Sequence, residues 1–299
     1  MNTAVIITKT MKNVCIAMIT DVLTDPFTHY LFMRRALAAC IVLSAGAVPL
    51  GIFMTLRRMT LVGDAMSHAI LPGVALAFLV FGLSVWPMTI GGFVVGVIVA
   101  IVATLLTRTT QLKEDASFTL IYLMSLAGGI ILISTKGNSI DLLHILFGNI
   151  LAIDNDALYL VTGVSWATVI TICALYRGLV IECFDPDFLK SSGRRNFIGQ
   201  VFFILLVINL VASFQALGTL MALGLMILPS IATRFWTRNM DTAIAVGIGI
   251  AIVSSFAGLL ISYYYRVPSG PAVVLLIGVV AFISTLIGRY GSLRNYLAR

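Results

Sequence analysis

The sequence predicts an all-α protein, a bundle of transmembrane helices, and its composition and the length of its apolar stretches lead to that fold class. Hydrophobic residues make up 60% of the 299 residues, charged residues only 10%, and the mean hydropathy is +1.07. Soluble domains carry about 25% charged residues, so this composition excludes an ordinary globular enzyme. The apolar stretches are also long enough to cross a bilayer, which takes about 20 residues per helix.

About nine stretches qualify as spans, and counts of eight or ten are also compatible with the pattern. Residues 1–30 are expected to form an interfacial amphipathic segment, because Lys9 and Lys12 interrupt any signal-peptide core. Residues 31–290 then form the transmembrane domain and 291–299 a cytoplasmic tail. A further apolar piece, 142–153, is too short to cross and is expected to be re-entrant or interfacial. In order, the expected spans are 33–56, 65–83, 86–107, 116–135, 157–177, 196–215, 217–236, 242–264 and 271–289.

Charged residues separate these spans and predict their orientation. With the N-terminus outside, 13 of the 19 Lys and Arg residues fall in the inner loops and the C-terminal tail. Excess Lys and Arg marks cytoplasmic loops, so the net charge of +7 indicates topology and not affinity for nucleic acid. The pair Arg34 and Arg35 is the exception. Pro72, Pro87 and Pro229 lie in or at the ends of spans and are expected to bend or break helices.

Asp64 and His68 are the first candidate site, four residues apart at the start of the second span. On a helix this spacing places both side chains on one face. An ionisable group at membrane depth is costly and therefore indicates function, and a carboxylate with an imidazole suits Mn, Fe or Zn. Two alternatives remain: Asp64 could instead cap the helix, with Ser67 three residues on, and His68 could be an interhelical hydrogen-bonder.

Asp141 and His144 form a second, weaker candidate on the outer side. Their i, i+3 spacing also places them on one face of a helix, where they could guide or gate a metal ion. A helix cap and an interfacial histidine are the alternative interpretation.

The segment between the fifth and sixth spans predicts a short cytoplasmic helix. Asp185 followed by Pro186 is a typical helix start, and Gly193 is a suitable stop. The element would present Phe184 and Phe188 beside Asp187, a composition that suits docking into a cleft on a partner. An ordinary capped loop with its aromatic rings in the lipid interface is the alternative.

Together these segments resemble the permeases of metal-ion ABC importers, the membrane subunits of bacterial zinc, manganese and chelated-iron uptake systems. The resemblance covers roughly residues 30–290. Its most specific segment is LRRMTLVGDAMSHAILPG at 56–73; DLLHILFGNIL at 141–151 and Phe-Asp-Pro at 184–186 follow, and QALGTLM at 215–221 leading to Leu-Pro at 228–229 is the weakest.

The resemblance implies a type II ABC importer-like permease that moves Mn²⁺, Zn²⁺ or Fe²⁺ from an extracytoplasmic metal-binding protein into the cytoplasm. It would sit in the bacterial cytoplasmic membrane as a homodimer, or with a closely related second permease, above two copies of an ABC ATPase. Asp64 and His68 would meet the transported ion, no cofactor would be bound permanently, and 184–192 would be the coupling helix.

A proton-coupled secondary carrier of a metal or small solute, with Asp64 and His68 as a proton relay, is the competing interpretation. It gives the aromatic cytoplasmic segment no purpose. The chain contains no G-x-x-x-x-G-K-[ST] loop and no H-E-x-x-H, so it is expected to be a transport subunit, with ATP hydrolysed by a partner.

Overall fold

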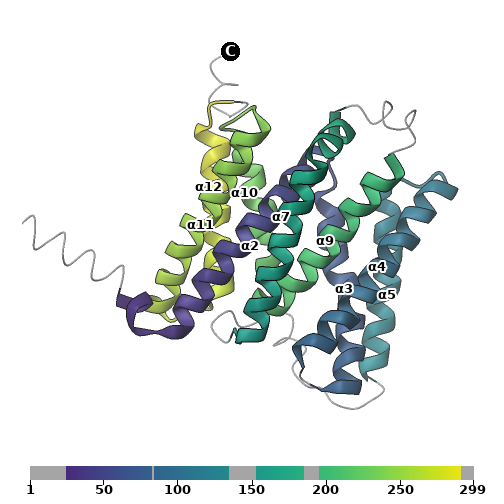
Figure 1. Ribbon diagram of the computed structural model, residues 1–299, viewed down its shortest axis with the longest axis horizontal. Coiled ribbons are helices and arrows are strands. Elements are labelled where there is room, and N and C mark those ends of the chain that lie inside the picture. Colours follow the sequence, from purple (N-terminus) through teal and green to yellow (C-terminus); the bar gives the residue numbers. More distant parts are fainter. Residues whose placement is uncertain (1–24, 83, 135–152, 185–194, 291–299) are drawn as a thin grey trace, which may run out of the picture.

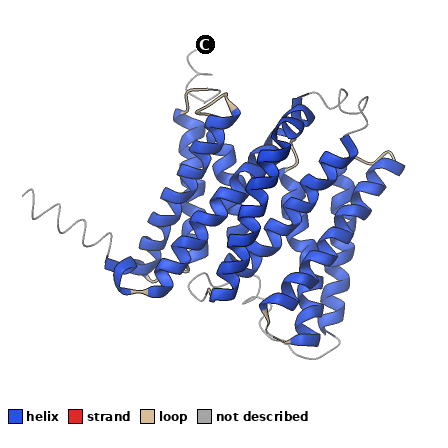
Figure 2. Ribbon diagram, in the orientation of Figure 1, coloured by secondary structure: helices blue, strands red, loops and turns tan. Residues whose placement is uncertain are grey.

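The computed structural model describes residues 25–82, 84–134, 153–184 and 195–290, and its regular elements are all helices (Figure 2). In these ranges nine long helices coincide with the nine expected spans, which confirms the fold class. Seven of them are long and apolar enough to cross a membrane; the apolar parts of the other two, Asp115–Ile131 and Thr219–Thr233, are shorter. The helices are α2 (Leu31–Leu56), α3 (Thr60–Phe81), α4 (Val85–Thr109), α5 (Glu114–Ser134), α7 (Asn155–Phe184), α9 (Arg195–Leu217), α10 (Thr219–Thr233), α11 (Met240–Tyr265) and α12 (Ser269–Ile287).

The bundle has two flanks and a centre (Figure 1). On one flank α3 packs against α4 and α5, and on the other α12 packs against α10 and α11. Between them, α2 contacts α7, α10 and α11, while α9 joins α7 to α4. Because successive helices alternate in direction, the C-terminal ends of α2, α4, α7, α10 and α12 lie at the same end of the bundle (Figure 1).

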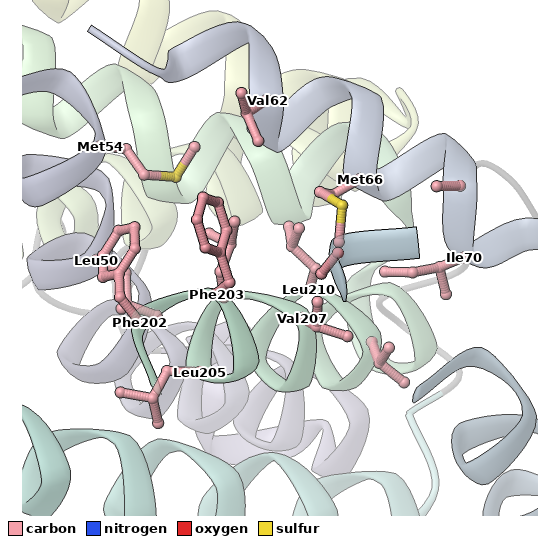
Figure 3. Close-up of a cluster of buried hydrophobic side chains, with 14 of the residues drawn as sticks. Leu50, Met54, Val62, Met66, Ile70, Phe202, Phe203, Leu205, Val207 and Leu210 are labelled. Atoms are coloured by element: carbon pink, nitrogen blue, oxygen red, sulfur yellow. The ribbon is translucent and has the colours of Figure 1, made fainter. Parts of the chain in front are cut away.

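Helix α3 is held by a buried stripe on the side that faces α9. Val62, Met66 and Ile70 follow one another at intervals of four residues, and all three are buried. Figure 3 shows them opposite α9, whose Val207 and Leu210 belong to the same hydrophobic cluster. Apolar residues at this spacing line one face of a helix, so packing against α9, together with α4 and α5, fixes the rotation of α3 about its axis.

Two tight turns fix the connections of α2 with α3 and of α9 with α10. Arg58 adopts a left-handed conformation (φ 59°), while its amide donates to the Thr55 carbonyl and the Met59 amide donates to the Met54 carbonyl. This is the Schellman pattern that ends helices, here without the usual glycine. Helices α9 and α10 are joined by the single residue Gly218 at φ 85°, a conformation that favours glycine.

Some expected boundaries differ from the observed ones. Helix α3 begins at Thr60 instead of residue 65, and α7 continues to Phe184 instead of ending at 177, because hydropathy marks the apolar part of a helix, not its end. Pro72 and Pro229 lie inside continuous helices, so the expected breaks do not occur there. Neighbouring helices satisfy or cover the backbone at such prolines in membranes.

Candidate functional site

Asp64 and His68 project from the second and third turns of α3. Their closest approach is 3.8 Å, from His68 Nε2 to Asp64 Oδ1, which is too long for a hydrogen bond. The side chains are 59% and 37% exposed, respectively. Because α3 starts at Thr60, Asp64 is not its N-cap, and the capping interpretation was wrong. The two side chains are therefore not hydrogen-bonded to each other, and both are partly exposed.

The opposite face of α3 and helix α5 position this pair. Ser67 is buried and donates its hydroxyl to the Gly63 carbonyl at 3.1 Å. Ser125 of α5 donates to the Ala69 carbonyl at 3.1 Å, which fastens α5 beside the pair. The Tyr122 ring of α5 lies 6.4 Å from the His68 ring, centroid to centroid. The imidazole thus has an aromatic neighbour and remains 37% exposed.

The exposed face around the pair extends along α3. Leu61 is exposed, and with Asp64 and His68 it repeats at helical spacing on one side of the helix. Across the described residues, no group of three or more His, Cys, Asp or Glu side chains is close enough to hold a metal ion. Since transition metals in proteins usually take four or more ligands, the pair can supply only part of a coordination shell. No other described residue completes the shell, so the remaining ligands would come from water, from another chain or from parts of this chain outside the described ranges.

A second polar feature was missed by the sequence analysis. Arg57, directly after α2, pairs with Glu182 near the end of α7, and both side chains are almost fully buried. The Arg57 guanidinium also stacks on the Phe202 ring of α9, 4.7 Å from its centroid. An acidic residue inside an apolar helix was the available signal, but Glu182 was assigned to the loop because the fifth span was ended at 177.

Other predicted site residues lie outside the described part of the chain. This applies to the Asp141–His144 pair and to the coupling residues Asp185, Pro186, Asp187 and Phe188. Phe184 is described: it is the last residue of α7 and is 72% exposed.

Fold and site together define a multi-pass membrane protein with a carboxylate–imidazole pair in an apolar helical bundle. This combination is typical of membrane transport proteins. Comparison with known proteins gives the family. Residues 29–288 match the model of the ABC 3 transport family, and the chain belongs to that family.

The relatives are similar over most of their length. The manganese import system permease protein ScaB of Streptococcus gordonii is 33% identical over 257 residues, which is 86% of this chain and 91% of the relative. The chelated iron transport system membrane protein YfeD of Yersinia pestis is 31% identical, with 87% and 86% covered. Among solved structures, PsaBC from Streptococcus pneumoniae in complex with Fab matches with a TM-score of 0.80 at 32% identity, over 93% of this chain and 99% of that one. The expected ABC permease fold is confirmed.

Proposed function

We propose that this chain is the permease subunit of an ATP-driven importer of divalent transition-metal ions such as Mn²⁺ or Fe²⁺. Membership of the ABC 3 transport family and the manganese and chelated-iron transport named for its relatives support this proposal. The observation that carries it is the pair of Asp64 and His68 on a helix that is otherwise apolar. Both side chains are partly exposed, and Asp64 does not serve as the helix cap. Carboxylate oxygen and neutral imidazole nitrogen are ligands that such ions accept.

Two copies of the permease would complete the site. The exposed face of α3 carries only one carboxylate and one imidazole, so a partner related by a two-fold axis would double both. Four ligands around an axis form a suitable set for a divalent transition metal. A second, closely related permease with the same pair would serve equally.

The remaining partners would bind at the two ends of the bundle. The chain has no nucleotide-binding loop, so an ABC ATPase in two copies would contact the end where α7 finishes at the exposed Phe184 and the chain continues into 185–188. An extracytoplasmic metal-binding protein would deliver the ion at the opposite end, where Asp141 and His144 could receive it. The Lys and Arg distribution supports a bacterial cytoplasmic membrane protein with its N-terminus outside and its C-terminus in the cytoplasm.

Mn²⁺ uptake into proteoliposomes that contain the permease with its ATPase tests the site. Asp64→Asn and His68→Gln keep the side-chain size but weaken or remove a ligand, and each should reduce ATP-driven uptake by about tenfold or more, the equivalent of roughly 1.4 kcal/mol. The matched control is Asp25→Asn with His29→Gln, an Asp–His pair at the same spacing and 3.2 Å apart, just before α2. Unchanged uptake in both α3 variants, or uptake driven by a proton gradient without ATP, would refute the proposal.

Substitutions of two exposed aromatic residues at opposite ends of α7 test where the ATPase binds. Phe184→Ser should weaken co-purification of the ATPase, because it removes the exposed ring nearest the proposed contact. Tyr159→Ser, at the other end of the same helix and also 72% exposed, should leave co-purification unchanged. Equal ATPase recovery with both variants would contradict this placement of the contact.

A further inference from the structure

The Arg57–Glu182 ion pair is buried at the end of the bundle where α2 and α7 finish. The Arg57 Nη2 atom contacts Glu182 Oε1, and the two side chains are only 11% and 7% exposed. Burying two charges is expensive, and apolar residues of similar volume are often as stabilising in such places. Stability alone is therefore a weak explanation for an ion pair at this position.

Arg57 also reaches α9. Its guanidinium lies over the ring of Phe202, which is fully buried two turns into α9. One turn earlier, Gly199 brings the α9 backbone close to the pair: a Cβ there would lie 3.1 Å from Glu182 Oε1. Helix α7 ends and α9 begins on either side of residues 185–194. One arginine thus contacts both helices that flank this segment.

A short hydrogen-bonded turn connects the same arginine to α3. Arg57 is the C-cap of α2, and its amide donates to the Phe53 carbonyl at 3.0 Å. The Schellman turn through Arg58 and Met59 then leads directly into α3 at Thr60. Asp64 lies only four residues into α3, a rise of about 6 Å along the axis. A shift of Arg57 would therefore move the N-terminal end of α3 with it.

We propose that Arg57, Glu182 and Phe202 form a coupling cluster that transmits movement of the α7 and α9 ends to the metal-binding turn of α3. They are positioning residues, because they act on Asp64 and His68 through the helix and not by contact with the ion. The inference rests on the proposed function, since it assigns the ATPase contact to the segment between α7 and α9. A charged pair suits this task because its attraction is retained when the helices shift by a fraction of an ångström, whereas apolar contacts weaken steeply over that distance.

The experiment measures Mn²⁺ transported per ATP hydrolysed by the complex in proteoliposomes, together with its melting temperature. Glu182→Gln keeps the shape of the side chain and removes its charge. It should lower the ratio by about 2- to 30-fold, the range over which a coupling contact acts. Arg234→Gln, at the exposed arginine that follows α10 at the same end of the bundle, is the control and should leave the ratio unchanged.

The double variant Arg57→Met/Glu182→Leu separates coupling from stability. The double variant removes both buried charges, so its melting temperature should be closer to that of the wild type than the melting temperature of Glu182→Gln is. The ratio of Mn²⁺ transported to ATP hydrolysed should stay low. A ratio that recovers together with the melting temperature would show a purely structural role and overturn the inference, as would a wild-type ratio in Glu182→Gln. A wild-type complex without ATP-driven Mn²⁺ uptake would instead refute the proposed function itself.

Discussion

Replacing Gly258 by alanine should force α11 and α12 apart. A Cβ at this position would lie 2.6 Å from both Cα and Cγ2 of Val273, whereas ordinary contacts begin at 3.4 Å. The two helices must therefore separate locally by about 0.8 Å. A gap of that size forfeits roughly a quarter to a half of each affected van der Waals contact, and overpacking of this kind typically costs about 1–3 kcal/mol.

Gly249→Ala on the same helix is the matched control, because a Cβ there meets no atom within 4 Å. An exposed helical glycine replaced by alanine gains roughly 0.5–1 kcal/mol. The two alanine variants should therefore differ by about 1.5–4 kcal/mol with opposite signs, on the order of 2–6 °C in melting temperature for a chain of this size. The assay is thermal unfolding of the purified protein in detergent. Equal melting temperatures for both variants would show that the α11–α12 contact is not as close as described.

Three further predictions concern single positions. Arg58→Gly should raise the melting temperature, because a non-glycine residue in the left-handed conformation costs about 1–2 kcal/mol; a lower value would contradict the described turn. Asn209→Leu removes the hydrogen bonds that the Asn209 side-chain amide donates to Thr168 Oγ1 (2.5 Å) and to the Leu205 carbonyl. Because hydrogen bonds in membranes are weak, the free energy of unfolding should change by less than about 1 kcal/mol, and thermal unfolding of the variant checks this. A label placed after Arg299 should react only from the cytoplasmic side, and labelling from outside would reverse the topology.

The helices were predictable because the property that defines them is local. Nearly every stretch of about 20 apolar residues must become a helix in a membrane, where backbone groups have no water to bond. The ends were less predictable, since charges such as Asp64 and Arg177 were taken as boundaries but lie within α3 and α7. A helix can carry a charge where a partner, a cavity or the membrane surface accommodates it, and hydropathy does not contain that information.

The candidate site was predictable in part for the same reason. Asp64 and His68 share a face because they are four residues apart, which any helix guarantees. The pairing of Arg57 with Glu182 depends on how α2 and α7 pack and joins residues far apart in the sequence. Local spacing carries no signal for such a contact, so only the folded structure reveals it.

The shortness of α10 has a consequence for the surrounding lipid. Its 15 residues rise about 22 Å, less than the roughly 30 Å of a bilayer's hydrocarbon core, and its first residue follows the buried Gly218. Such hydrophobic mismatch is relieved by local thinning of the membrane or by oligomerisation. Neighbouring helices already bury ten of the 15 residues of α10, so the bundle itself relieves much of this mismatch, and lipid meets the short helix only at exposed positions such as Leu220.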